Sequence, residues 1–186
     1  MNIALKCFFG ISLTLINFAC NQQSNDVKQG AAAKAVDPEI MGNYKVEISA
    51  MLDSFNVAAA RADFNKYFDY FAEDGVFIGT DATENWNKQD FKIWAKPFFD
   101  KGTTWNFTSL QRSIYFDQTG NIAWFDELLK TQMKICRGSG VLTRKGNDWK
   151  IQQYVLSMTV PNDLVDTVVS LKTPLEEGII QGLEKK

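Results

Sequence analysis

The stretch NIAWFDELLKTQMKICRGSG, residues 121–140, reads as a sheet strand that carries one acid among apolar side chains. Successive side chains of a strand point to opposite faces. One face is expected to carry Ala123, Phe125, Glu127, Leu129, Met133 and Ile135. The other is expected to carry Trp124, Asp126, Lys130, Gln132 and Lys134. An unpaired buried carboxylate costs several kcal/mol or takes up a proton, so Glu127 on the more apolar face needs a partner or a ligand.

Arg137 is the nearest candidate partner in sequence, provided that the chain turns near residues 134–136. Two interpretations of a Glu127–Arg137 pair remain open. It is either an internal ion pair that ties two strands together, or a pair that lines a cavity and fixes a polar group of a small molecule. The second interpretation has a chemical basis, because the guanidinium fork matches a ligand carboxylate well.

The segments around this strand predict more sheet. Residues 75–80, GVFIGT, read as a strand, and TTWNFTSLQRSIYFD, residues 103–117, alternates large and polar side chains. Turn residues at 117–121 and 145–148 predict two hairpins, and the last strand is expected to end near Pro161.

Helices are predicted before and after these strands. Asp37 and Pro38 begin a long amphipathic helix over residues 38–60, Asp63 caps a short second helix, and Asn87 begins a third. An aromatic stripe marks the third helix: Phe91, Trp94, Ala95, Phe98 and Phe99. Pro97 and Gly102 mark its expected end, and core packing is one interpretation of the stripe. Residues 162–186 predict one or two terminal helices broken at Thr173–Pro174, which completes an α+β pattern.

The N-terminal segment indicates export. Residues 1–19 carry an early cation, Lys6, and an apolar run too short to span a bilayer but typical of a signal peptide. Ala19 before Cys20 resembles a bacterial lipoprotein signal, which implies a lipid on Cys20 and a membrane anchor in the cell envelope; plain signal cleavage is the alternative. Residues 20–36 are polar and alanine-rich, as in a flexible tether.

Composition excludes several classes of chemistry. The 186 residues suit one domain, and a net charge of −2 without a dense basic run argues against nucleic acid as a partner. The chain has no histidine, and Cys136 is the one cysteine beyond the N-terminal segment. Ser-His and Cys-His nucleophile pairs, ordinary zinc sites and a phosphate-binding P-loop are therefore not expected, and no metal or cofactor is predicted.

An ordered series of motifs resembles the SnoaL-like branch of the NTF2-like superfamily. The motifs are FAEDGVFIGTDATENW, KPFF, AWFDE, CRGSGVLTR and WKIQQYVLSMTVPN, and they cover about residues 53–163. The resemblance implies a cone made by a curved antiparallel sheet wrapped around helices, with one open end and often a homodimer across the sheets. We expect this domain over residues 37–163 and a helical extension over 164–186. Isomerases, cyclases, dehydratases, epoxide hydrolases and non-catalytic binding domains share the fold, so it does not give function.

Residues near the expected mouth of the cone are candidates for ligand contact. Asp81, Glu84 and Trp86 lie in GTDATENW, between the first strand and the third helix. Local turn and cap hydrogen bonds explain Asp81 and Glu84 without a ligand. Alternatively, Glu84 and Trp86 line the entrance. The loop lacks the ligand density of a calcium site.

The interior supplies the other candidates. Phe98, Trp105 and Arg137 are expected beside a ligand, although tryptophan is more often a packing residue. Glu127 with Tyr154 from the last strand forms a candidate catalytic pair, by analogy with the aspartate base and tyrosine of ketosteroid isomerase. A nearby arginine argues against that role because it lowers the pKa of a carboxylate.

Three functions remain open. The first is an exported domain that binds a small, partly apolar molecule in its cone. The second is an isomerase, dehydratase or cyclase that uses Glu127 as an acid or base. The third is a non-catalytic interaction domain, which would present an exposed apolar patch.

Overall fold

Helices precede and follow a sheet of six strands in the part of the chain that the structure, a computed structural model, describes, residues 36–185. The helices are α1 (Pro38–Ala60), α2 (Phe64–Asp69), α3 (Lys88–Asp100) and α4 (Val165–Glu184), with a short 3₁₀ helix, η1 (Asn162–Leu164). The strands are β1 (Phe71–Ile78), β2 (Asn85–Asn87), β3 (Thr108–Phe116), β4 (Ile122–Thr131), β5 (Lys134–Lys145) and β6 (Asp148–Met158). This order confirms the α+β prediction. The signal peptide, Cys20 and the tether lie outside the described residues, except for Val36.

The three predicted helix starts are confirmed by their caps. Asp37 accepts a hydrogen bond from the Glu39 amide at 2.9 Å, and Asp63 accepts one from the Lys66 amide at 3.1 Å. Asn87 Oδ1 accepts from two amides of the first turn of α3. Each cap satisfies amide groups that have no partner within the helix.

The predicted break of the terminal helix at Thr173–Pro174 was wrong. Pro174 lies inside a single continuous α4, whereas α3 ends at Asp100, between Pro97 and Gly102 as predicted. Proline removes one helical hydrogen bond. In α3 the lost hydrogen bond lies in the last turn. In α4, which buries none of its residues, water can reach the carbonyl that loses its partner.

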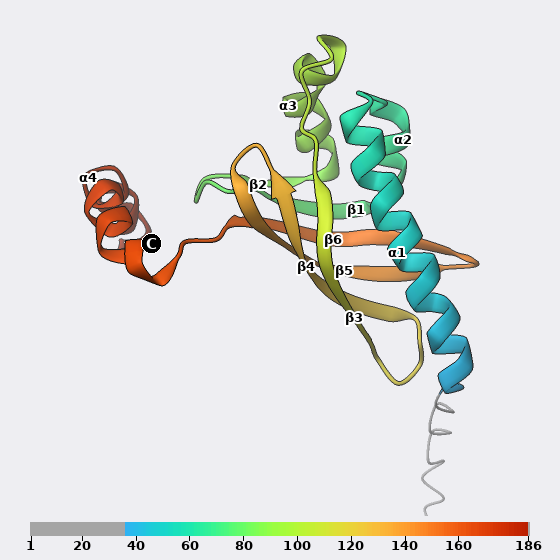
Figure 1. Cartoon of the computed structure of the whole chain (residues 1–186). Coiled ribbons are helices and arrows are strands. Elements are labelled where there is room, and N and C mark those ends of the chain that lie inside the picture. Colours follow the sequence, from blue (N-terminus) through green and yellow to red (C-terminus); the bar gives the residue numbers. More distant parts are fainter. Residues whose placement is uncertain (1–35, 186) are drawn as a thin grey trace, which may run out of the picture. The chain divides into compact units, whose positions relative to one another are not determined.

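The sheet has the order β2-β1-β6-β5-β4-β3. The predicted antiparallel pairing holds for every pair of the described strands except β1–β6, which is parallel. Figure 1 shows that the strands curve past α1 and that α2 and α3 lie near the upper end of α1 in this view. Hairpins at residues 117–121 and 145–148 are confirmed, but β1 begins four residues before the predicted start at Gly75.

The turn between β4 and β5 differs from the predicted one, and its position determines which residues pair across the two strands. It lies at Gln132–Met133, before the predicted position at 134–136, and Lys134 adopts a positive φ of 70°. Ala123, Phe125, Glu127 and Leu129 share the inner face as predicted. Ile135 is exposed and Cys136 buried, so the predicted face was wrong for Ile135, because the chain reverses before it.

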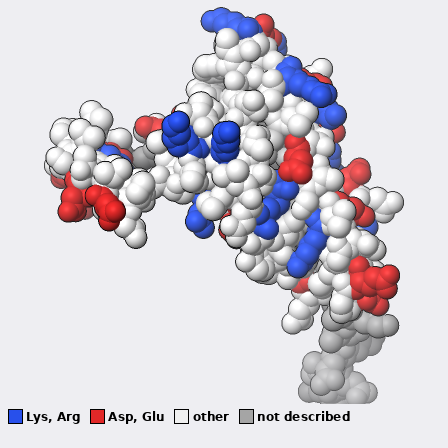
Figure 2. All heavy atoms as spheres, in the orientation of Figure 1, with Lys and Arg blue, Asp and Glu red and all other residues white. Residues whose placement is uncertain are grey.

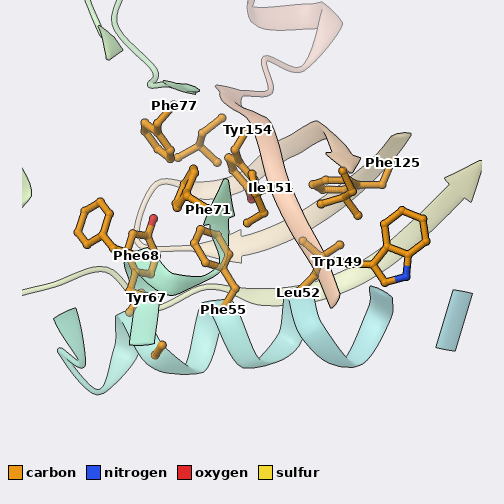
Figure 3. Close-up of a cluster of buried hydrophobic side chains, with 14 of the residues drawn as sticks. Leu52, Phe55, Tyr67, Phe68, Phe71, Phe77, Phe125, Trp149, Ile151 and Tyr154 are labelled. Atoms are coloured by element: carbon orange, nitrogen blue, oxygen red, sulfur yellow. The ribbon is translucent and has the colours of Figure 1, made fainter. Parts of the chain in front are cut away.

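The core joins the buried face of α1 to the inner face of the sheet. Figure 3 shows Leu52 and Phe55 of α1 directed toward Ile151 and Tyr154 of β6. In the aromatic stripe of α3, Phe91, Ala95 and Phe99 are buried as core packing predicts, while Trp94 and Phe98 are each 40% exposed. The stripe is therefore divided between the core and the surface.

Basic and acidic side chains are mixed on the face of the molecule in Figure 2. This agrees with the small net charge of the sequence. No helix between residues 36 and 185 is long and apolar enough to cross a membrane.

Candidate functional site

A cavity of about 190 Å³ lies where α3, the β1–β2 loop and the β4–β5 turn meet. Twelve of the described residues line it; six of these are aromatic, and none is a lysine or an arginine. The lining residues are Phe77, Gly79, Thr80, Glu84, Trp86, Phe91, Trp94, Trp105, Phe107, Gln132, Met133 and Leu156. We call this space the aromatic cavity. Apolar walls with a few polar groups are typical of small-molecule sites.

Five rings of the aromatic cavity lie nearly parallel. They are Phe77, Trp86, Phe91, Trp94 and Trp105. Phe91 contacts the other four, and its plane is inclined to theirs by 11° to 22°. Trp86 and Trp94 stack with centroids 4.8 Å apart. Because α3 and β2 are sequence neighbours, a short chain segment supplies three of these rings.

The β1–β2 loop holds Glu84 at the wall of the cavity. The loop is closed by hydrogen bonds from the Gly79 amide to the Glu84 carbonyl, 2.9 Å, and from the Glu84 amide to the Asp81 carbonyl, 3.0 Å. Glu84 Oε2 also accepts from the Asp81 amide at 3.2 Å. A Cβ on Gly79 would lie 2.1 Å from this oxygen. Because residue 79 is a glycine without a Cβ, the Glu84 carboxylate can occupy this space.

Asp81 serves the turn itself. Its Oδ1 accepts from the amide and the hydroxyl of Thr83, at 2.9 Å and 2.6 Å. These hydrogen bonds lower the pKa of Asp81. Asp81 is exposed and is not part of the cavity wall, so local turn bonding explains it.

Glu127 lies in a separate, buried network. Its side chain is 1% exposed, and Oε2 accepts from Arg112 Nε at 3.0 Å and Nη2 at 2.8 Å. Oε1 accepts from the Tyr154 hydroxyl at 3.2 Å. Arg112 also donates to Asp53 Oδ1 at 2.8 Å and to the Ser49 carbonyl at 3.0 Å. Both oxygens of the Glu127 carboxylate thus accept hydrogen bonds from the protein, as a buried charged group requires.

The predicted Glu127–Arg137 pair was wrong. In the β4–β5 register Glu127 faces Gly138, whereas Arg137 faces Leu128 on the outer side of the sheet. Arg137 is 54% exposed and lies 4.0 Å from Asp126. The earlier turn at Gln132–Met133 is the reason, because it sets this register.

The environment of the network shifts two pKa values. Burial lowers the pKa of Arg112, but Glu127 and Asp53 raise it more, so it lies above its ordinary value. Burial and the nearby Glu127 charge raise the pKa of Tyr154 well above its ordinary value. Arg112 is therefore a cation and Tyr154 a hydrogen-bond donor throughout the physiological pH range.

The structure brings together some of the predicted site residues. Glu84, Trp86 and Trp105 line the aromatic cavity, and Glu127 and Tyr154, which do not line it, are hydrogen-bonded to each other. Phe98 and Arg137 do not line the cavity.

Sequence reasoning missed Arg112 and Trp94. The signal for Arg112 was present, because it lies two residues before the buried Ile114, on the same strand face. The turn at 117–121, which was predicted correctly, also sets the β3–β4 register in which Arg112 lies opposite Glu127. Trp94 was assigned only to the α3 stripe, and the sequence did not indicate that it reaches the cavity.

The same fold occurs in solved bacterial structures of low sequence identity. An NTF2-like protein of unknown function from Pseudomonas putida KT2440 is 14% identical, with a TM-score of 0.56 over 66% of this chain and 91% of that one. An uncharacterized protein with a cystatin-like fold from Caulobacter vibrioides is 11% identical, with a TM-score of 0.55 over 69% and 97%. A putative aromatic ring hydroxylase from Novosphingobium aromaticivorans is 14% identical, with a TM-score of 0.54 over 62% and 89%. At these identities the likeness shows the fold alone.

Comparison with curated proteins gives no match. The family model of the SnoaL-like domain matches residues 48–161, which is more than half of the chain and includes every residue of the aromatic cavity and the Arg112–Glu127–Tyr154 network. The chain therefore belongs to the SnoaL-like domain family.

Proposed function

We propose that this domain binds a small, partly apolar molecule in the aromatic cavity. The observation that carries the proposal is the cavity wall, in which six aromatic residues gather beside one carboxylate. Rings that face a cavity lose solvent-exposed apolar area when a ligand enters, and this favours binding. Trp94 is 40% exposed, so a ligand at this wall covers surface that now meets water.

The size of the cavity limits the ligand. Drug-sized ligands occupy sites of about 300–1,000 Å³, and an apolar cavity of about 150 Å³ holds benzene. A space of about 190 Å³ therefore suits a molecule of one or two rings, or an aliphatic chain of similar volume.

The proposal is tested with quinoline, a neutral two-ring probe, by equilibrium dialysis against the purified full-length chain. We expect saturable binding of one quinoline per chain, and at least about a tenfold loss of affinity in Trp94→Ala, equivalent to about 1.4 kcal/mol. Trp124→Ala is the matched control, because Trp124 is 45% exposed on the outer face of the sheet, away from the cavity. Absence of saturable binding, or equal losses in both variants, contradicts the proposal.

Catalysis by Glu127 and Tyr154 is a second candidate, favoured by one observation. The Tyr154 ring stacks on Phe77, which lines the aromatic cavity, with centroids 5.8 Å apart. However, Glu127 is engaged by Arg112 and Tyr154 at both oxygens, and a general base must reach the proton that it abstracts. The test is turnover of enolisable ketones and epoxides: activity that Glu127→Gln abolishes in a folded protein supports this candidate.

Export and attachment to a membrane through Cys20 remain part of the proposed function. Support comes from the sequence of residues 1–20 alone. Labelling with radioactive palmitate in the native host tests it, since Cys20→Ser should lose the label and leave the membrane fraction. If the label persists in Cys20→Ser, Cys20 is not the lipidated residue.

A homodimer across the outer face of the sheet is also proposed. The exposed, stacked pair Tyr115 and Trp124 on this face is the support for it, with ring centroids 6.1 Å apart. Sedimentation equilibrium should give twice the chain mass for the native sequence and the single mass for Trp124→Asp. A single chain mass for the native sequence contradicts a homodimer.

A further inference from the structure

The electrostatics of the aromatic cavity indicate which charge its ligand carries. We infer that the cavity selects a flat organic cation, such as an aromatic ring that bears a quaternary or protonated nitrogen, over neutral and anionic molecules of the same shape. This inference rests on the proposed binding function and adds to it the chemical class of the ligand.

The first step is the balance of charge at the cavity wall. Glu84 is the only charged side chain among the twelve lining residues, all of which lie in the described part of the chain. The other polar side chains of the wall, Thr80 and Gln132, are neutral. An anionic ligand would therefore meet a carboxylate and no compensating cation, which is unfavourable at a partly desolvated site.

The second step is the chemistry of the rings. The face of an aromatic ring carries negative charge density, and a cation within about 6 Å of the ring centroid is attracted to it, most strongly by tryptophan. Three tryptophans, Trp86, Trp94 and Trp105, line the cavity. The rings and Glu84 thus favour the same sign of charge in the ligand.

The third step is the shape that the rings favour. Five ring pairs form among Trp86, Phe91, Trp94 and Trp105, with interplanar angles of 11° to 32°. Offset stacking of near-parallel rings is a favourable arrangement, and a planar ligand extends it with little reorganisation. A bulky aliphatic cation cannot make the same contacts.

The fourth step is the position of Glu84, which the loop fixes before any ligand binds. Oε2 is held by the Asp81 amide, and no protein hydrogen bond to Oε1 occurs within residues 36–185. Glycine at residue 79 leaves room for this placement. Oε1 is therefore free to accept a hydrogen bond from a protonated nitrogen, or to lie beside a quaternary one.

The test compares three probes of similar shape by isothermal titration calorimetry on the full-length chain: N-methylquinolinium, quinoline and 2-naphthoate. We expect the cation to bind at least about tenfold more tightly than the anion, with quinoline between them. Glu84→Gln should remove most of the preference for the cation and leave the affinity for quinoline within about twofold, because it removes the charge and keeps the shape. Glu39→Gln, in the exposed first turn of α1, changes the net charge equally and should leave all three affinities unchanged.

The outcomes separate this inference from the proposed function. If quinoline and 2-naphthoate bind as tightly as N-methylquinolinium, and Trp94→Ala weakens all three, the cavity binds ligands but the inference about charge is overturned. A preference for the cation that persists unchanged in Glu84→Gln overturns the part of the inference that assigns the charge selection to Glu84. If no probe binds, the proposed function fails together with the inference.

Discussion

Glu84 and Glu127 are two acidic residues of the same domain whose surroundings give them opposite roles. Glu127 is almost fully buried, and Arg112 and Tyr154 occupy both of its oxygens. Glu84 lies at the wall of the aromatic cavity, and among the described residues its side chain accepts a hydrogen bond from a backbone amide alone. A carboxylate whose partners are all within the protein stabilises the fold, whereas one with an unused oxygen beside a cavity is available to a ligand.

The difference also explains why the more conspicuous acid in the sequence is not the better site residue. Glu127 is conspicuous in the sequence because it interrupts an apolar strand face. The same burial forces the protein to neutralise it internally, since an unpaired buried charge is costly. Changes in the Arg112–Glu127–Tyr154 network should therefore alter stability, and changes in the aromatic cavity should alter affinity.

Removal of Arg112 should have the largest effect on stability. Arg112→Leu leaves Glu127 buried without its cation, and we expect a loss of about 3–5 kcal/mol in the free energy of unfolding, measured by urea denaturation. The double variant Arg112→Leu, Glu127→Leu should recover a large part of this loss, because both buried charges are gone. A double variant as unstable as the single one would contradict the assignment of Glu127 as the main partner.

Gly138→Ala should have the next largest effect. A Cβ on Gly138 would lie 2.5 Å from the Tyr154 hydroxyl and 3.1 Å from Glu127 Cγ. The crowding displaces the hydrogen-bonded pair, and we expect a loss of about 1–3 kcal/mol by urea denaturation. Gly178→Ala in α4 is the control, since nothing lies within 4 Å of its Cβ position and alanine favours a helix.

Tyr154→Phe should cost about 1 kcal/mol near neutral pH, because one hydrogen bond to Glu127 is lost. The pKa of Tyr154 is raised in the folded chain, so the folded state binds this proton more tightly than the unfolded state. The resulting stability is present below about pH 10, the ordinary tyrosine value, and falls as the pH rises above it. Urea denaturation from pH 7 to pH 11 should show a shallower fall in Tyr154→Phe; an identical fall in both proteins would contradict the shift.

Arg137→Leu should have the smallest effect. Arg137 is exposed and 4.0 Å from Asp126, and surface pairs of this kind contribute about 0–1 kcal/mol. We expect a change within about 0.5 kcal/mol in urea denaturation. A loss comparable with that of Arg112→Leu would restore Arg137 as the partner of Glu127.

Local patterns predicted the elements well because their causes are local. The caps at Asp37, Asp63 and Asn87, and the hairpin turns at 117–121 and 145–148, depend on a few neighbouring residues. The errors arose where Pro174 was taken as a break in the terminal helix and where the turn before Lys134 was placed two residues late. A shift of the turn changes the pairing of the whole hairpin, which is why it moved Arg137 to the outer face.

The sequence by itself determined the α+β class, the helix starts, the inner face of β4 and the need of Glu127 for a partner. Only the tertiary structure decided that this partner is Arg112 and that Trp94, Trp105 and Glu84 share one cavity. The physical reason is the range of the interactions. Caps and face alternation depend on residues a few positions apart, whereas strand register and the packing of α3 against the sheet depend on residues far apart in the chain.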